Sequence, residues 1–272
     1  MARSIDPAPK AVRGFVPARS DEERYLMRHI EDLARTAESR GIPRYSAFLS
    51  DREQDLARAA LNRAAVPENV YHFEGGWPGA ERRLLCLEPE GSWPDSPLCC
   101  VRLTCRVQAG AALPAHKDYL GSLMGLELRR EALGDIVLPS DAPGTAYVFA
   151  LEPAAQLICQ ELLQAGRVEV TTQLLPLEEL PEFPQAERTL QTATVSSLRL
   201  DAVLAAMLHC SRSMAAELIT AGRVEINHLP VESVHAPVYE GDVFTVRGKG
   251  RFGLTALPEK QKDRAIIEFF QY

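Results

Sequence analysis

The sequence lacks the features that mark membrane proteins, zinc proteins and disulfide-stapled proteins. No apolar run approaches the roughly 20 residues of a membrane-spanning helix, and the opening stretch MARSIDPAPKAVRGF has no signal-peptide core. The six cysteines form no C-x-x-C pair, and no histidine pair completes a zinc pattern. We therefore expect a cytoplasmic protein without membrane segment, metal or cofactor, with its cysteines as free thiols in a reducing compartment.

Signatures of the commoner enzyme classes are missing as well. The chain has no G-x-G-x-x-G loop and no G-x-S-x-G nucleophile elbow. His116 and Asp118 resemble an acid–base pair, but residues two apart do not face each other on a helix. Asp118 is better interpreted as the N-cap of a helix. The sequence therefore predicts a protein that is not an enzyme.

Positive charge is in deficit over the whole chain, whose net charge is −7. This deficit argues against a protein that coats nucleic acid with its entire surface, but it leaves room for a local basic patch. With 272 residues, of which 46% are hydrophobic, the chain is long enough for two or three domains with buried cores.

The N-terminal third predicts a tail followed by a helical pair. Residues 1–19 are proline-rich and without periodicity, which is typical of a disordered tail. Ser20 with Glu23, and Ser50 with Glu53, have the spacing of capping boxes at the start of two helices. Gly41 and a following proline end the first helix. We expect a helical segment over residues 20–65.

The middle, residues 66–175, predicts a ferredoxin- or RRM-like domain. In CCVRLTCRV the odd positions are apolar and the even positions polar from Arg102 on, which indicates a strand with one buried face. Helices are expected near 118–130 and 153–165, and further strands near 135–139, 146–151 and 167–174. The order β-α-β-β-α-β is that of the split βαβ motif. Short strands at 70–73 and 84–87 are included in this domain.

The last third predicts a linker, a compact domain and an extension. Residues 176–196 carry prolines and glutamates and read as a linker. Residues 197–257 contain two amphipathic helices, with Met214 and Leu218 in the apolar stripe of the second, and then short strands. Residues 258–272 form a C-terminal extension. The predicted fold class is thus α+β throughout.

Cations in this last domain occupy special positions. Arg212 stands at the start of the second helix and Arg223 after its glycine stop, about three helical turns apart, so we expect both near one azimuth. In GDVFTVRGKGRF, glycines space Arg247, Lys249 and Arg251 and let the backbone approach a ligand closely. From Arg199 to Arg251 the cations and anions balance, so the acidic excess lies elsewhere. Helix N-termini and arginines of this kind favour RNA phosphates.

The stretch RLDAVLAAMLHCSRSMAAELITAGRVEIN, followed by EGDVFTVRGKGRF, resembles the S4-type RNA-binding domain. R-L-D, S-R-S, L-I-x-x-G-R-V and G-D all fall in order, over about residues 197 to 254. The resemblance implies a surface for structured RNA. Its residues would be Arg199, Ser211, Arg212, Ser213, Arg223, Asn227, Arg247, Lys249 and Arg251.

GGWPGAERRLL and AHKDYLGSLMGLELRREALGDI are similar to signature segments of the YlmH-type S4-domain family, also known as photosystem II S4 domain protein-like. That family has an N-terminal helical part, a ferredoxin- or RRM-like middle domain and a C-terminal S4 domain. The resemblance implies a monomer on the large ribosomal subunit, bound to 23S rRNA and to tRNA of stalled peptidyl-tRNA complexes, in ribosome-associated quality control. Lys117 and Glu127 depart from the family pattern, where Arg and Gly are usual.

Several alternatives stay open. The chain could be a ribosome-assembly factor, an RNA-modifying enzyme that uses the S4 domain for docking, or a protein-binding adaptor. Too few residues follow Leu254 for the catalytic domain that a pseudouridine synthase would carry there. Secondary RNA contacts are expected in the middle of the chain, although neighbouring glutamates make solvated faces an equal interpretation for the arginines. These residues are Arg82, Arg83, His116, Lys117, Arg129 and Arg130.

Overall fold

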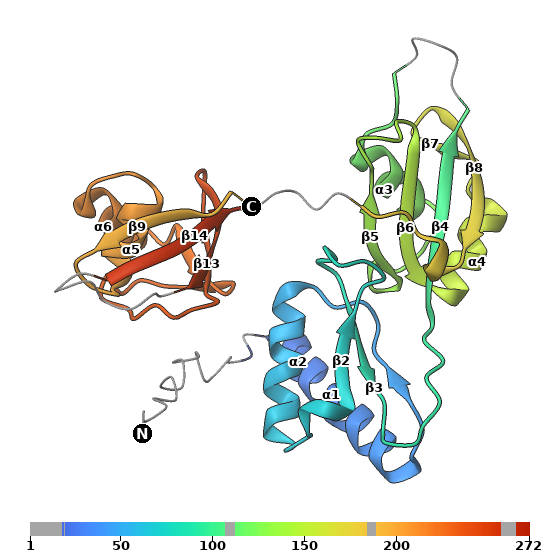
Figure 1. The fold of residues 1–272 in the computed structure, drawn as a ribbon, viewed down its shortest axis with the longest axis horizontal. Helices are drawn as coiled ribbons and strands as arrows, with labels where there is room; N and C mark the ends of the chain where they lie inside the picture. The colour runs from blue at the N-terminus through green and yellow to red at the C-terminus, as the bar shows by residue number, and fades with distance from the viewer. Residues whose placement is uncertain (1–17, 19, 107–111, 184–188, 257–264) are drawn as a thin grey trace, which may run out of the picture. The chain divides into compact units, whose positions relative to one another are not determined.

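The structure is a computed structural model that describes residues 18, 20–106, 112–183, 189–256 and 265–272. It divides into two compact units, an N-terminal unit within residues 16–185 and a C-terminal unit within residues 186–272 (Figure 1). The predicted tail lies almost wholly outside the described residues. Each unit is described by itself.

The N-terminal unit begins with two helices and a small antiparallel sheet. Helix α1 spans Asp21–Arg40 and helix α2 spans Asp51–Arg63. The sheet has the strand order β1-β3-β2, from strands β1 (Arg44–Tyr45), β2 (Tyr71–Glu74) and β3 (Leu84–Leu87). A 3-10 turn at Glu68–Val70 precedes β2.

Local chemistry at the helix ends follows the sequence. The Glu23 backbone N–H donates to Ser20 Oγ at 3.2 Å, and the Ser50 backbone N–H donates to Glu53 Oε2 at 2.7 Å. Gly41 ends α1 with a φ of 61°, in the left-handed region that glycine adopts at little cost. The Glu23 carboxylate also pairs with Arg52 of α2 at 2.9 Å, which ties the two helices together.

Strands β2 and β3 were expected in the middle domain, and that assignment is wrong. They pair with β1, Tyr45 lying opposite Cys86 and Tyr71 opposite Leu87. Leu85 and Leu87 are buried in the same cluster as the apolar faces of α1 and α2. Two helices cannot bury their apolar stripes alone, and this sheet supplies the second layer.

The rest of the N-terminal unit is the predicted βαββαβ domain. Its sheet has the order β5-β6-β4-β8-β7 with every neighbouring pair antiparallel, which is the ferredoxin-like arrangement. Its 3-10 turns lie at Arg130–Ala132 and Leu177–Glu179. The elements are β4 (Leu98–Cys105), α3 (His116–Met124), β5 (Leu133–Val137), β6 (Thr145–Leu151), α4 (Glu152–Glu161), β7 (Gln164–Ala165) and β8 (Val168–Leu175).

Strand β4 does not have the single buried face that was predicted. Val101 and Leu103 pack under α3 and α4, as the alternation indicated. Leu98 and Cys100, on the opposite face, are also buried, in a cluster with Phe48 and Leu84 from the preceding helix-and-sheet part. The middle sheet is therefore covered on one face by its own helices and, at one end of the other face, by the N-terminal elements.

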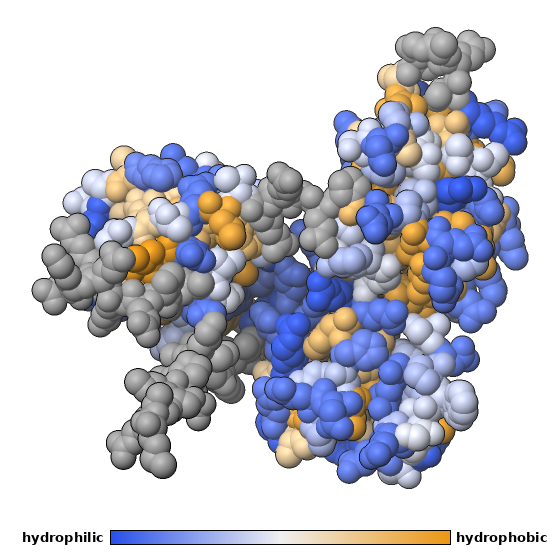
Figure 2. Space-filling model, in the orientation of Figure 1, coloured by the Kyte–Doolittle hydropathy of each residue, from blue (hydrophilic) through white to orange (hydrophobic). Residues whose placement is uncertain are grey.

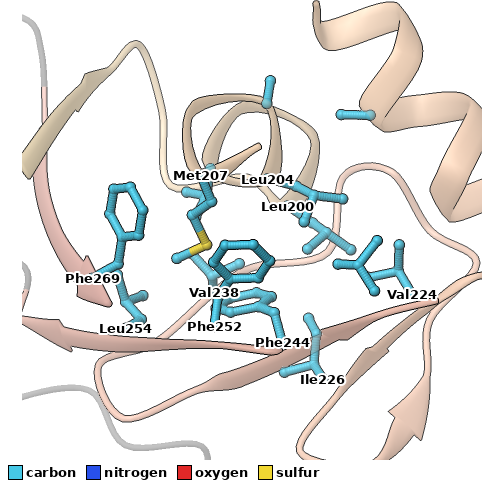
Figure 3. Close-up of a cluster of buried hydrophobic side chains, with 14 of the residues drawn as sticks. Leu200, Leu204, Met207, Val224, Ile226, Val238, Phe244, Phe252, Leu254 and Phe269 are labelled. Atoms are coloured by element: carbon cyan, nitrogen blue, oxygen red, sulfur yellow. The ribbon is translucent and has the colours of Figure 1, made fainter. Parts of the chain in front are cut away.

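The C-terminal unit packs two helices on a six-stranded sheet of order β11-β10-β12-β13-β14-β9. Side chains of α5 such as Leu204 and Met207 point toward Phe244 and Phe252 of the sheet (Figure 3). The elements are β9 (Gln191–Val195), α5 (Leu200–Met207), α6 (Arg212–Thr220), β10 (Val224–Ile226), β11 (Leu229–Pro230), β12 (Val243–Val246), β13 (Gly250–Ala256) and β14 (Ala265–Gln271).

Two predicted boundaries of this unit are wrong. Residues 191–195, expected to belong to the linker, form β9, and residues 265–271, expected to be an extension, form β14. These two strands pair with each other, Ile267 opposite Ala193. Ile267 and Phe269 are fully buried in the core, so the C-terminal residues complete the domain rather than follow it.

No single helix in the described ranges is long and apolar enough to span a membrane. Only α5 and α6 taken together pass by length and composition, and they are bent by 112° at their junction. Both helices supply buried residues to the C-terminal core, which explains their apolar composition. On the face of the N-terminal helices shown in Figure 2, hydrophilic residues predominate and hydrophobic ones reach the surface in small groups.

Candidate RNA-binding surface

Arg212 is the first residue of helix α6, so a cation lies at the helix N-terminus, as the sequence predicted. Ser211 is the N-cap, and its Oγ accepts the Met214 backbone N–H at 3.2 Å. Arg212 and Ser213 follow in the first turn, and both are exposed. Ser211 therefore has a capping role, while its two neighbours are accessible to a ligand.

Asp201 organises the arginines at this end of the helices. Its carboxylate, buried to 6% exposure, accepts from Arg212 Nη2 at 2.6 Å and from Arg199 Nη2 at 3.1 Å. Arg199 also contacts the ring of His235. Burial by itself raises the pKa of Asp201, but hydrogen bonds and charge from Arg212 and Arg199 outweigh it and lower the pKa. We call Arg199, Asp201, Arg212 and His235 the Asp201 cluster.

The backbone brings this cluster together from three segments. Arg199 is the N-cap of α5, Arg212 opens α6, and His235 lies in the loop between β11 and β12. That loop returns to the start of α5, where the Leu200 N–H donates to the Ala236 carbonyl at 2.9 Å. One anion is thus shared by two arginines whose side chains remain 40% and 50% exposed, which leaves a net positive group at the surface.

Arg223 belongs to a second group, at the opposite end of α6. The expectation that Arg212 and Arg223 share one azimuth is wrong, because the helix ends at Thr220 and Gly222 leaves it with a φ of 64°. Instead, Arg223 Nη2 donates to the Arg247 carbonyl at 2.8 Å, which fixes the side chain against the β12–β13 turn.

The β12–β13 turn presents its cations on a tight loop. The Lys249 N–H donates to the Val246 carbonyl at 2.9 Å, and Gly248 has a φ of 79°, as the third residue of a type II turn requires. A Cβ on Gly248 would lie 3.2 Å from Arg223 Nη2. Arg247 and Lys249 are exposed on either side of this glycine. We call Arg223, Arg247 and Lys249 the turn cluster.

Two of the predicted contact residues have structural roles. Asn227 has a φ of 47° in the β10–β11 hairpin; its amide donates to Asp242 at 2.8 Å and accepts the Val243 N–H at 2.8 Å. Arg251 lies on β13 with its guanidinium 4.5 Å from the centre of the Tyr272 ring. Asn227 holds the hairpin in place, and Arg251 covers the last residue of the chain.

Burial changes the charge balance at this surface. The segment from Arg199 to Arg251 has as many anions as cations, but Asp201 and Asp242 are buried, at 6% and 1% exposure. Arg212, Arg223, Arg247 and Lys249 are all exposed. Within this segment the exposed side chains are therefore more positive than the sequence as a whole, which favours phosphate binding.

Most of the arginines predicted as secondary RNA contacts instead donate hydrogen bonds to backbone carbonyls of the protein itself. Arg82 donates to the carbonyls of Phe48 and Leu133 at 3.0 Å each. Arg130 donates to the Leu133 carbonyl at 2.7 Å, and burial followed by the nearby charge of Arg82 lowers its pKa. The Arg83 guanidinium donates to the Ala80 carbonyl at 2.8 Å. Arg82 thus links its loop to Phe48 and β5, whereas Arg83 and Arg130 brace their own turns, and of the four arginines only Arg129 is exposed.

His116 and Lys117 are exposed in the first turn of α3. The prediction of Asp118 as N-cap is wrong. The N-cap is Ala115, and Asp118 accepts the Ala115 N–H at 2.9 Å from the third helical position. Asp118 therefore fixes the helix start, while His116 and Lys117 remain available to a ligand.

The open sheet face that RRM domains use for base stacking is partly closed here. Tyr147 and Phe149 occupy that face on β6, and Phe183 packs edge-on against both, with ring centres 4.9 and 6.3 Å away. Trp77 lies 5.7 Å from Phe183 and donates to Asp135 at 3.3 Å. The aromatic side chains thus anchor the chain's own loops.

Sequence reasoning missed two surface features of the C-terminal unit. His235 reaches Arg199 across 36 positions in the chain, and no local pattern signals such a contact. Met214 was placed in the buried stripe of α6, but it is 50% exposed in the first turn of the helix, because Ala215, Leu218 and Ile219 form the side that faces the core.

Two family models match parts of this chain. The S4 domain family matches residues 198–244, and the family described as "Putative RNA-binding domain in YlmH" matches residues 111–179. The cell division protein YlmH of Streptococcus pneumoniae aligns with a TM-score of 0.47 and 17% identity, over 61% of this chain and 98% of that one.

A curated relative covers almost the whole chain. Ribosome-associated protein quality control protein P2 of Bacillus subtilis is 32% identical over 253 residues, which are 92% of this chain and 95% of the relative. One family match lies in the middle domain, and the other lies in the cationic C-terminal unit. The chain therefore belongs to the YlmH-type family of S4-domain RNA-binding proteins, and it is an RNA-binding protein.

Proposed function

We propose that this protein binds 23S rRNA on the large ribosomal subunit, where it acts without catalysis in ribosome-associated quality control of stalled nascent chains. The observation that carries the proposal is the 32% identity, over nearly full length, to a relative named for that process. A stalled complex holds a peptidyl-tRNA, and tRNA is the second RNA that we propose as a partner. The proposed compartment is the cytoplasm, where ribosomes work.

The arrangement of charge supports a structured RNA as the ligand. The Asp201 cluster and the turn cluster lie at the two ends of α6, a helix of nine residues and thus about 13 Å long. Two cationic groups at a fixed distance can contact two phosphates that the fold of an RNA holds at a similar distance. Arginine can also fork onto phosphate oxygens or stack on an unpaired base, which suits a folded RNA with exposed bases.

The test is sedimentation of the tagged full-length protein through a sucrose gradient. One variant carries Arg212→Ala and Lys249→Ala, which removes one exposed cation from each cluster. A matched variant carries Arg35→Ala and Arg58→Ala, two arginines on the exposed sides of α1 and α2. We expect the wild type and the matched variant to run with large subunits and the cluster variant to stay at the top.

Salt provides the second readout. Each lost phosphate contact reduces the slope of log affinity against log salt by about one, so the cluster variant should show a slope smaller by about two. Sequencing the RNA in the large-subunit fraction then identifies any tRNA. If wild type and both variants remain at the top of the gradient, the ribosomal assignment is wrong and the RNA partner is a different one.

A further inference from the structure

A compact group of metal-ligand side chains lies in the N-terminal unit, far along the chain from the cationic residues. His72 and Glu74 come from β2, and Cys86 comes from β3 directly opposite His72. One ligand atom from each of these three residues lies within 4.8 Å of the others. Spacing in the sequence did not reveal them, because the hairpin between the strands separates Cys86 from the other two.

The alternation of the strands explains why these side chains converge. Tyr71 and Phe73 of β2 pack with the helices, so the residues between and after them point to the other face of the sheet. Cys86 belongs to that other face and is fully buried, while Glu74 is half-buried and His72 exposed. A sulfur, a nitrogen and an oxygen donor thus meet at the edge of a buried cluster, with one side open to solvent.

Two carboxylates lie close to the sulfur and nitrogen donors. Glu74 Oε2 lies 3.6 Å from Cys86 Sγ, and Glu88 Oε2 lies 3.8 Å from His72 Nδ1. In the described part of the chain, neither Glu74 nor Glu88 pairs with a lysine or an arginine. Both carboxylates accept hydrogen bonds, Glu74 from the Cys86 thiol and Glu88 from Tyr45, and their negative charge favours a cation at this place.

We propose that His72, Glu74 and Cys86 bind one zinc ion, with water in the fourth position and Glu88 as an outer carboxylate beside the histidine. Zinc takes mixed S, N and O ligands, whereas magnesium rejects thiolate. Ligand atoms of a tetrahedral zinc site lie about 3.3 to 3.6 Å apart, given bonds of about 2.0 to 2.3 Å. The Cys86 thiol now donates a hydrogen bond to Glu74 at 3.6 Å, a separation within that range, and a rotation of the exposed His72 ring would bring its nitrogen to the same spacing.

Binding would convert the Cys86 thiol to a thiolate, and the released proton would go to solvent. The ion would cross-link β2 to β3 at the base of the hairpin that carries Trp77. Surrounding hydrogen bonds already orient the ligands, since Ser96 Oγ donates to Glu74 at 3.1 Å and Tyr45 contacts Glu88 at 3.4 Å. The proposed role is structural, and it is independent of RNA binding.

The experiment titrates the full-length, metal-free protein with zinc by calorimetry and with cobalt(II) by absorption spectroscopy. We expect one zinc per chain and a thiolate-to-cobalt charge-transfer band. Loss of an outer-shell partner costs about 10–100-fold in metal affinity, so His72→Ala and Glu74→Gln should each weaken binding by about 100-fold or more. Cys86→Ser should abolish the charge-transfer band.

Two control variants test whether zinc binds to a thiol or an imidazole elsewhere in the chain. Cys159→Ser and His29→Ala remove a thiol and an imidazole outside the group, and both should bind zinc as the wild type does. Because the buried Cys86 is the ligand whose loss threatens folding, the exposed His72 provides the decisive variant, checked by thermal melting. Zinc binding that is absent in the wild type, or equal in the His72→Ala and His29→Ala variants, would overturn the proposal.

Discussion

Removing the negative charge of Asp201 should weaken RNA binding, although it makes the surface more positive. The Asp201→Asn substitution keeps the size of the side chain but loses the charge that holds Arg199 and Arg212 in place. Simple charge counting predicts tighter binding to RNA. The geometry of the Asp201 cluster predicts the reverse, and the two effects can be compared in size.

The gain from removing the anion is small. A unit charge about 8 Å from a phosphate contributes about 0.5 kcal/mol in water and about 2 kcal/mol at the effective dielectric of about 20 of a protein surface, and screening at physiological salt reduces either value to roughly a third. The loss is larger. Arg199 and Arg212 are 40% and 50% exposed, and both are fixed by the carboxylate at 3.1 and 2.6 Å. Ordering a released side chain again on binding costs about 0.5–1.5 kcal/mol for each arginine. The net weakening is about 1–2 kcal/mol, or about 5- to 30-fold in Kd.

The assay is co-sedimentation of the variant with purified large ribosomal subunits at two salt concentrations. Asp32→Asn is the control, since it removes the same charge from an exposed ion pair with Arg35 on α1 and should leave the Kd unchanged. Thermal melting shows that Asp201→Asn is folded under the assay conditions. If Asp201→Asn binds as tightly as the wild type or more tightly, the carboxylate does not position the arginines and the reasoning fails.

Four further predictions follow from the same structure. Gly248→Ala should destabilise the β12–β13 turn by about 1–2 kcal/mol and lower the RNA affinity, because a residue with a Cβ is strained at a φ of 79° and crowds Arg223; chemical denaturation and co-sedimentation measure both effects. Phe183→Ala should cost the N-terminal unit about 3 kcal/mol in urea unfolding by removing three ring contacts, and an unchanged midpoint would contradict this packing. A chain that ends before residue 265 should fail to fold its C-terminal unit, as circular dichroism would show, since buried Ile267 and Phe269 with their neighbours supply about 5–8 kcal/mol. Because the pKa of Asp201 is lowered in the folded state, its stabilisation is present at neutral pH and is lost as the pH falls below about 4, so Asp201→Asn should lose less stability on acidification than the wild type.

Features set by local chemistry could be predicted from the sequence. The caps at Ser20 and Gly41, the glycine stop after α6, and the order of elements in the βαββαβ domain all follow from short patterns. These signals succeed because capping bonds and positive φ angles depend on residues only a few positions apart. The α+β class and the family were predicted correctly on the same basis.

Features set by distant pairing could not be predicted in the same way. Strand β9 is short and polar on one side, and it becomes a strand only because β14, some 70 positions later, lies beside it. The stretch AIIEFFQ does alternate, so the signal for β14 was present but its partner was not evident. Likewise, Arg82 reads as a free surface cation until Phe48 and Leu133 offer it their carbonyls.

The exposed side chains of the middle domain and of the C-terminal unit differ, and this difference is the basis of a proposal on how each part meets RNA. In the middle domain, Phe183 covers the aromatic pair Tyr147 and Phe149, so base stacking on that pair requires displacement of the chain's own side chain. The exposed cations of this domain include Lys117 and Arg129, with the His116 ring exposed beside Lys117. Exposed charge contacts phosphates and does not read bases. The C-terminal unit instead holds arginines in fixed positions around Asp201 and Gly248, and fixed arginines discriminate RNA shape. We therefore propose that specificity resides in the C-terminal unit and that the middle domain adds affinity that salt removes.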